Sequence, residues 1–459
     1  MIMGPEKQDQ PVLPREVAAA LNLLDPLVAT VDSDGRLVLP AEVVRGLGLS
    51  PGISVTLGRE PNGVHLRRPV EQLVKVYVEP TSRCNLDCRT CIRNSWDDPQ
   101  GDMNEETFIR VLEGLRAFDP MPSVFFGGFG EPLTHPRILD MIAEVVALAR
   151  ASDPRPKVEL ITNGCLLCEE TSKRLIEIGL DTLWVSLDGV RPESYEDVRL
   201  GALLPDVLDN LRRFQQLRRE IHGVKKSPFD WWEDPRWYFE RGAYHYLTPE
   251  LGIAFVAMRR NVSDLRELRT LAHELGAALF SVSNLLPYTE DMEKEILYRD
   301  SLAVRPIPTA GHRQLGLPRM DIGDLAVLSC WYGGGFAGEH ASGMRGSCPF
   351  VEAGTVAISW RGNVSPCLPL LHSHTEFLRG SQRQVHRHAV GNAVECDLKD
   401  IWSDLAYTAF RRRVQEFDFP PCIECGGCTL SDDNKEDCES DVFPRCGACL
   451  WSQGFIRCP

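Results

Sequence analysis

Between residues 71 and 300 the sequence alternates short apolar runs with amphipathic segments, and this alternation constrains the fold more than any other feature. Helical spacing of apolar residues separates runs that are typical of strands. Because consecutive strand–helix units give parallel strands with right-handed crossovers, the pattern predicts an α/β domain built as a partial (β/α)6 barrel. The expected strands are 75–79, 123–126, 158–162, 182–187, 252–257 and 279–283, and the expected helices are 105–117, 136–149, 168–178 and 263–275.

Three cysteines directly follow the first expected strand. Cys84, Cys88 and Cys91 have the spacing C-x3-C-x2-C. Three thiolates can bind three irons of a [4Fe–4S] cube, which leaves the fourth iron without a protein ligand and open to chemistry. Zinc is an alternative, but it takes four ligands and commonly uses paired C-x2-C knuckles, and no such partner lies near Cys91. Buried free thiols are the other alternative.

This cysteine spacing resembles the signature of the radical S-adenosylmethionine (radical SAM) family. The resemblance implies a [4Fe–4S] cluster on the three cysteines, with its open iron chelated by the amino and carboxylate groups of S-adenosyl-L-methionine (SAM). It also implies reductive cleavage of SAM to a 5′-deoxyadenosyl radical that abstracts a hydrogen atom from a C–H bond. No catalytic residue beyond the cluster is assigned. Many members carry an aromatic residue before the third cysteine, where this chain has Thr90.

Three further strand ends carry segments similar to SAM-binding motifs of this family. Residues 127–132 (GGFGEP) resemble the Gly-Gly-Glu motif, in which glycines allow close backbone approach and a carboxylate accepts hydrogen bonds from a cationic amino group. The next two strands end in TNG and SLDG, and simple turns are the alternative for such segments. The resemblance implies SAM contacts from Gly127, Gly128, Gly130, Glu131, Asn163, Ser186 and Asp188.

Eleven of the sixteen cysteines lie between Cys330 and Cys458, and part of this array resembles the SPASM extension of radical SAM maturases. The resemblance implies two auxiliary [4Fe–4S] clusters, which need eight thiolates, and ten are present from Cys348 onward. Zinc is the alternative, because two C-x2-C pairs are spaced like ribbon knuckles. The assignment to individual clusters stays open, and the implied ligands are Cys348, Cys367, Cys422, Cys425, Cys428, Cys438, Cys446, Cys449 and Cys458.

The segment 26–70 contains two hairpin turns and a Gly-Arg-x-x-x-Pro pattern that begins at Gly35. It resembles the AbrB-like swapped-hairpin domain, whose relatives bind DNA as intertwined dimers. The basic and acidic residues of the segment nearly balance, whereas DNA-reading domains are usually more basic. The sequence therefore favours dimerisation or partner docking over DNA binding.

The remaining segments complete the predicted domain organisation. Residues 222–250 form an insertion that is rich in aromatic residues. It can be a lid or a substrate platform, or its aromatic side chains can simply pack on the outside of the barrel. Two H-x-H pairs lie at 372–374 and 386–388, and we expect solvated loop histidines there rather than a metal site. For Cys165 and Cys168 we expect a buried structural pair rather than a redox role. The expected domains are a polar and helical segment 1–25, an AbrB-like domain 26–70, the radical SAM barrel 71–300 with its insertion at 222–250, a linker or lid 301–346, and a SPASM-like domain 347–459.

Composition narrows the classes of protein that remain. The chain has 459 residues and a formal net charge of −15, which speaks against broad nucleic-acid binding. The sequence contains no apolar run long enough to span a bilayer and does not begin with the layout of a signal peptide. We therefore expect a cytoplasmic protein without a membrane partner, in which cysteines are reduced and available to metal.

Taken together, the motifs resemble a radical SAM/SPASM maturase, in particular the group associated with tungsten-cofactor oxidoreductases. The resemblance implies a peptide, protein or metalloenzyme substrate, a tungsten-dependent oxidoreductase among them, and an electron donor such as ferredoxin or flavodoxin. It also implies dimerisation through the AbrB-like domain. Two other hypotheses stay open: an iron–sulfur redox-sensing DNA-binding regulator and a non-catalytic scaffold for metalloenzyme assembly.

Overall fold

The structure is a computed structural model in which the chain forms two compact units. One unit comprises residues 1–68 and 228–246, and the other comprises 69–227 and 247–459. The expected segments 1–25 and 301–346, and most of the aromatic insertion, lie outside the described residues. The described residues are 29–46, 55–60, 63–223, 247–297, 348–378, 380–420, 422, 428–453 and 455–456.

The first unit is small and rich in β-hairpins, as its sequence predicts. Its first turn is held by the Asp32 carboxylate, which accepts hydrogen bonds from the backbone N–H groups of Asp34 and Arg36. Gly35 follows at φ +77°, a left-handed conformation that favours glycine. The elements are two antiparallel pairs and one helix: β1 (Thr30–Val31) with β2 (Leu37–Val38), α2 (Ala41–Gly46), and β3 (Thr56–Glu60) with β4 (Gly63–Arg67).

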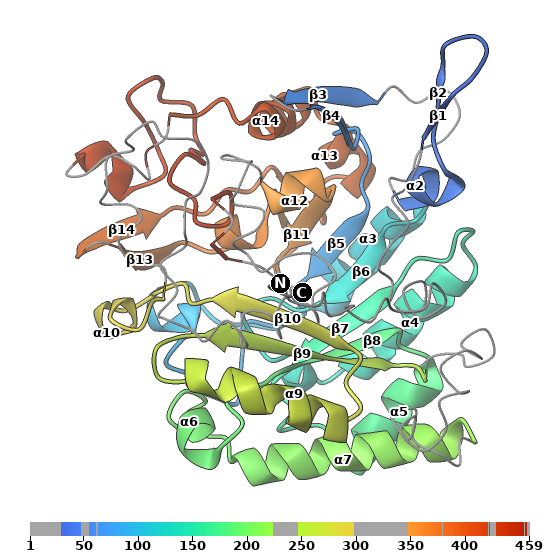
Figure 1. Ribbon diagram of the computed structural model, residues 1–459, viewed down its shortest axis with the longest axis vertical. Helices are drawn as coiled ribbons and strands as arrows, with labels where there is room; N and C mark the ends of the chain where they lie inside the picture. Colours follow the sequence, from blue (N-terminus) through green and yellow to red (C-terminus); the bar gives the residue numbers. More distant parts are fainter. Residues whose placement is uncertain are drawn as a thin grey trace, which may run out of the picture. The chain divides into compact units, whose positions relative to one another are not determined.

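The second unit contains the predicted parallel strands, and each expected strand is present to within about two residues at either end. They pair in the order of the sequence, as consecutive strand–helix units dictate. The partial-barrel prediction is therefore confirmed (Figure 1). The strands are β5 (Lys75–Val78), β6 (Ser123–Phe126), β7 (Val158–Thr162), β8 (Thr182–Ser186), β9 (Glu250–Ala257) and β10 (Leu279–Asn284).

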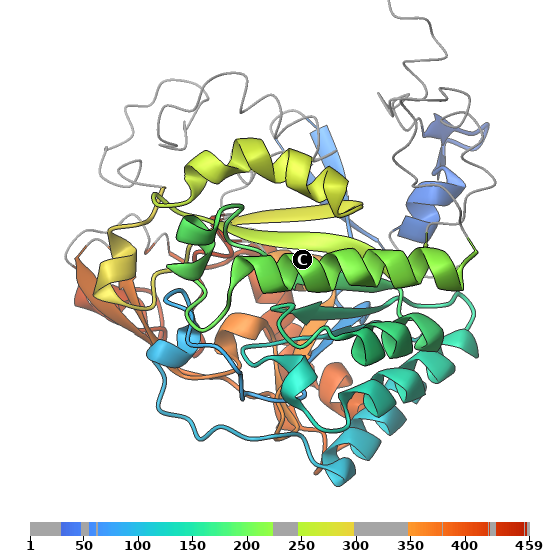
Figure 2. The ribbon, with the colours of Figure 1, turned by 90° about the horizontal axis from the view of Figure 1, so that it is seen from below.

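Helices cover one side of these strands in an arc (Figure 2). The first is capped by Asn104, whose side chain accepts a hydrogen bond from Thr107 N, and it buries Phe108, Val111 and Leu115 against the sheet. Within the described ranges, no helix combines the length and the apolar character needed to cross a bilayer. The helices are α3 (Glu105–Arg116), α4 (Ile138–Arg150), α5 (Glu169–Ile178), α6 (Pro192–Glu196), α7 (Leu204–Ile221), α9 (Leu265–Glu274) and α10 (Glu290–Glu293).

The cysteine-rich C-terminal region joins the same sheet, a connection that the sequence did not suggest. Strand β11 (Thr355–Ile358) pairs in parallel with β5, and β12 (Asn363–Ser365) and β15 (Gly391–Asn392) continue the sheet. The region is therefore joined to the barrel through the pairing of β11 with β5, the first strand of the barrel. Its other elements are α12 (Pro349–Glu352), the hairpin β13 (His374–Leu378) with β14 (Ser381–Val385), α13 (Leu398–Ser403) and α14 (Leu405–Glu416).

Two apolar cores lie on the two faces of this sheet. On β5, Val76 and Val78 belong to the core under the helices, whereas Tyr77 belongs to the other core, as strand alternation requires. This second core also contains Trp184 and residues of the C-terminal region such as Trp451. The inner face of the barrel is thus covered by the cysteine-rich region.

Candidate radical SAM site

The loop that carries the three clustered cysteines follows β5, at the carboxyl ends of the parallel strands. Backbone hydrogen bonds attach it to the segment between α6 and α7: Asp87 N donates to Leu200 O and Arg89 N donates to Val198 O. Cys84, Cys88 and Cys91 all line one cavity of about 240 Å³. The architecture therefore brings the three thiols together where ligands bind in folds of this kind.

Most of the predicted SAM-binding residues line the same cavity. Gly128, Gly130 and Glu131 enter it from the loop after β6, Asn163 from the end of β7 and Ser186 from the end of β8. The other two predicted residues do not line it. Gly127 continues the sheet by donating its N–H to Val78 O, at 2.9 Å. Asp188 is fully buried, accepts a hydrogen bond from Val256 N and forms an ion pair with Arg199 at 2.6 Å.

Glu131 links the loop after β6 to the end of β7 by hydrogen bonds. Its carboxylate accepts hydrogen bonds from Leu133 N, from the Thr162 hydroxyl and from Asn163 N, at 2.7 to 3.1 Å. Burial raises the pKa of Glu131, and these hydrogen bonds oppose that shift. A carboxylate offers about four acceptor positions, so about one remains for a donor in the cavity. Glu131 can therefore both hold the cavity wall and accept a hydrogen bond from a bound ammonium group.

The glycine at 130 is required by a close approach of two loops. A Cβ atom there would lie 2.1 Å from Thr81 O and 2.7 Å from Arg83 O, on the segment that leads to Cys84. Any side chain would therefore push the cysteine loop away from the loop after β6. Asn163 adds a second link, because its Nδ2 donates to Asn85 Oδ1 at 2.8 Å. The motif residues thus position the cysteine loop as well as lining the cavity.

Two arginines that the sequence analysis missed also line the cavity. Arg93 Nε donates to Cys91 Sγ at 3.4 Å, and Arg199 Nη1 lies 3.9 Å from Cys88 Sγ. Among the described residues, Arg199 Nε has no hydrogen-bond partner. Cationic groups beside thiolates stabilise their negative charge. No spacing in the sequence signals these contacts, because both depend on tertiary packing.

These features fit a cube held by three protein thiolates. Burial raises the pKa of the Cys84 and Cys88 thiols, whereas the nearby guanidinium groups of Arg93 and Arg199 act in the opposite direction. Among the residues that the structure describes, no three His, Cys, Asp or Glu side chains converge as tightly as a single metal ion requires. Each thiolate of a cube binds a separate iron, so its sulfurs need not converge in that way. The apolar wall comes from residues such as Phe129 and Tyr288.

A second group of cysteines lies in the C-terminal region. Cys348, Cys367, Cys446 and Cys449 pack against the inner core. Burial raises the pKa of each thiol, to about 12 for Cys348. The proximity of other members raises the pKa of Cys348, Cys367 and Cys446 further, and Cys449 is one of the neighbours of each. Such buried thiols gain most from a metal that replaces their protons. Cys422, Cys428 and Cys438 are described, Cys396 is exposed, and Cys425 and Cys458 lie outside the described residues.

Two smaller expectations are wrong in part. His372 and His374 are buried and hydrogen-bonded to carboxylates rather than solvated, with His372 bound to Glu79 and His374 to Glu376. Cys168 is exposed at the start of α5, so it does not belong to a buried pair. The environment of His372 depends on Glu79, which is distant in the sequence.

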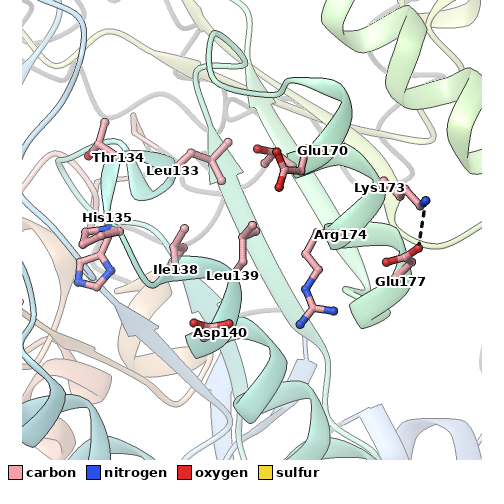
Figure 3. A pocket seen from close by; sticks show the side chains of 12 residues that line it. Leu133, Thr134, His135, Ile138, Leu139, Asp140, Glu170, Lys173, Arg174 and Glu177 are labelled. Carbon is pink, nitrogen blue, oxygen red and sulfur yellow. Dashed lines mark ion pairs between the residues drawn. The ribbon is translucent and has the colours of Figure 1, made fainter.

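A larger surface pocket, of about 610 Å³, lies between the start of α4 and α5 (Figure 3). It is lined by charged side chains of both signs, and Lys173 and Glu177 form an ion pair within it at 3.9 Å. None of the predicted site residues lines this pocket. The smaller cavity, with its thiols and buried polar groups, is therefore the candidate site.

Known proteins share this organisation. The radical SAM superfamily matches residues 78–225, the SPASM iron–sulfur cluster-binding domain matches 348–429, and the antidote–toxin recognition MazE family of bacterial antitoxins matches 28–73. A probable GTP 3′,8-cyclase of Methanocaldococcus jannaschii is 26% identical over 223 residues, 48% of this chain and 62% of that protein. The structure of native anSMEcpe with bound AdoMet and Cp18Cys peptide covers 84% of this chain and 96% of its own, at 16% identity and a TM-score of 0.49.

One relative matches nearly its whole length. The tungsten-containing aldehyde ferredoxin oxidoreductase cofactor-modifying protein of Pyrococcus furiosus is 30% identical over 394 residues, which is 84% of this chain and 96% of that protein. The match therefore extends well beyond the SAM-binding region. This chain belongs to the same family: it is a radical SAM enzyme with a SPASM iron–sulfur domain and an N-terminal MazE/AbrB-like domain.

Proposed function

We propose that this radical SAM enzyme is a maturase that modifies the cofactor of a tungsten-containing oxidoreductase. The observation that carries the proposal is the 30% identity to the cofactor-modifying protein across 96% of that relative. The cyclase relative, in contrast, aligns over 62% of its length. Similarity that extends beyond the barrel to most of that relative supports a shared substrate class.

We assign the residues of the cavity to the parts of SAM by their chemistry. Cys84, Cys88 and Cys91 would hold a [4Fe–4S] cluster, which when bound supplies the single electron that cleaves SAM. Glu131 would accept a hydrogen bond from the SAM ammonium group, and Ser186 and Arg199 would donate to its carboxylate. The support is that all of these residues line one cavity with the thiols.

Phe129 and Tyr288 would exclude water around the adenosyl group, because both rings line the same cavity. They would supply the apolar surface that Thr90 does not. Gly127 and Asp188 do not line the cavity, and they would act by positioning residues that do. Gly127 continues β6 toward the cavity, and Asp188 orients the Arg199 guanidinium through their ion pair.

We also infer the ligands of one auxiliary cluster. Cys348, Cys367, Cys446 and Cys449 would form one complete four-thiolate set, supported by their packing against the same core and by the effect of Cys449 on the pKa of each of the other three. Two of them lie beyond residue 429, where the SPASM match ends. The second cluster would draw its ligands from Cys422, Cys425, Cys428, Cys438 and Cys458.

The proposal includes two further partners. An electron donor such as ferredoxin or flavodoxin would reduce the SAM cluster, because reductive cleavage consumes an electron at each turnover. A second copy of the chain would pair with the N-terminal domain. The support is the first hairpin, in which Val31, Leu37 and Val38 are all exposed. Because a two-stranded hairpin is seldom stable alone, a second copy that covers these side chains would stabilise it.

Anaerobic reconstitution tests the proposal. About twelve irons per chain are expected from three cubes. Production of 5′-deoxyadenosine should rise when an immature tungsten oxidoreductase is added, and the oxidoreductase should gain activity. The Cys84→Ala variant should do neither. If Cys84→Ala still activates the oxidoreductase, the chain acts as an assembly scaffold and the maturase proposal fails.

A further inference from the structure

A buried carboxylate supports the cavity wall from behind. Glu79 stands at the end of β5 and is 1% exposed. Its Oε1 accepts a hydrogen bond from Phe129 N at 3.2 Å, and a Cβ atom on Gly128 would lie 2.8 Å from Glu79 Cβ. Gly128 and Phe129 both line the cavity, so the position of Glu79 determines where this part of the wall lies.

The partner of Glu79 comes from the cysteine-rich region. His372 Nε2 lies 2.9 and 3.1 Å from the two oxygens of Glu79, and His372 Nδ1 lies 3.3 Å from Asp98 Oδ2. Both ring nitrogens face carboxylates, an arrangement that favours the doubly protonated imidazolium. The ring also packs against Trp96, with centroids 4.3 Å apart, and against Phe129, with centroids 6.0 Å apart.

The charges around His372 come from three elements. Glu79 faces it from β5, and Asp98 faces it from the segment after Cys91. Arg387, which follows β14, forms an ion pair with Asp98 at 3.5 Å. The His374 ring contacts the backbone O of His372 and not its imidazole. Burial alone would lower the pKa of His372, but the two carboxylates outweigh burial and raise it.

We propose that His372 is a positioning residue for the SAM cavity: it holds Glu79 against the Phe129 N–H, so that a residue of the iron–sulfur domain sets the wall on which SAM binds. The inference rests on the proposed assignment of this cavity to SAM. Without His372, the described residues leave Glu79 as a buried carboxylate with the Phe129 N–H as its single, neutral donor, which is an unfavourable arrangement. The loop after β6 then shifts to admit water or another donor, and SAM loses affinity.

The dependence on pH follows from the count of protons. A neutral imidazole keeps one N–H, so it can donate to Glu79 or to Asp98 but not to both. The link to both carboxylates is complete at low pH, and it loses one donor and its positive charge as the pH rises above about 6.5 and through the raised pKa of His372. The amino group of SAM also titrates, near a pKa of about 8, and a variant without an imidazole shares that step.

The test is calorimetric titration of SAM into the reconstituted full-length protein. His372→Ala should bind SAM about tenfold more weakly, because a charge-assisted hydrogen bond to a buried group is lost. His372→Gln retains one donor and should recover part of the affinity. His386→Gln is the matched control, because His386 lies in the same region, is partly exposed and faces Asp433 only at 3.8 Å. Iron content and the cluster absorption spectrum report that each variant is folded.

The pH profile separates positioning from a general structural role. Affinity of the wild type should fall more steeply toward alkaline pH than that of His372→Gln. Equal affinities for the wild type and His372→Ala, or parallel pH profiles for the wild type and His372→Gln, would overturn the inference while leaving the proposed function intact. If the reconstituted wild type does not bind SAM at all, the cavity assignment fails, and the proposed function fails with it.

Discussion

Removing the positive charge of Arg93 should make the SAM cluster harder to reduce. Its guanidinium donates a hydrogen bond to Cys91 Sγ at 3.4 Å, and its side chain is only 8% exposed, so solvent screens it little. An electron added to a cluster held by these thiolates would be spread over the cube and would lie farther from the guanidinium than the sulfur does. Taking a separation of about 7 Å and an effective dielectric constant of about 20, the lost attraction is about 2.4 kcal/mol.

That energy corresponds to a shift of the one-electron potential by about 100 mV toward more negative values. The assay is a redox titration of reconstituted Arg93→Met, followed by electron paramagnetic resonance of the reduced cluster. Arg93→Lys should stay close to the wild type, because it keeps the charge. Arg89→Met is the matched control, since Arg89 lies in the same loop but is exposed and paired with Asp197. A potential of Arg93→Met that equals the wild-type value, or one that is less negative, would refute the electrostatic reasoning.

Three further predictions concern stability and iron content. Asn104→Ala should lower the free energy of unfolding by about 1 kcal/mol, measured by chemical denaturation, because α3 loses its N-terminal cap, whereas Asn104→Ser should not. Burial alone would raise the pKa of Glu376, but His374 and Arg383 outweigh it and lower the pKa. Its stabilising contribution is therefore present above about pH 4.3 and lost as the pH falls through the lowered pKa, so Glu376→Gln should unfold with a flatter pH dependence in acid. Cys446→Ser should reduce the iron content by about four per chain, and an unchanged count would remove Cys446 from the auxiliary ligands.

The barrel strands were predictable because their signal is local. Each is a short apolar run followed by an amphipathic segment, and β6 and β7 begin and end where the sequence places them. The cysteine loop was equally clear, because spacing within eight residues carries its chemistry. Sequence reasoning also placed Glu131 and Asn163 at strand ends that meet at one edge of the sheet.

The missed residues depend on contacts between distant parts of the chain. Arg199 and His372 approach the cavity only through the packing of α6 and of the C-terminal region, and no periodicity marks them. The pairing of β11 with β5 was missed for the same reason, since four apolar residues, 355–358, do not identify their neighbour. A buried His with two carboxylate partners could be sought in sequence only by knowing which segments pack together.

The pairing of β11 with β5 also bears on how the protein is made. Strand β5 emerges early from the ribosome, but its edge partner is complete only when Ile358 has been translated. Until then, the nascent chain exposes one open edge beside the metal-binding loop, which invites contact with other unfolded chains. Slowing translation between the barrel and β11 should therefore increase aggregation, whereas expressing the C-terminal region in trans should reduce it.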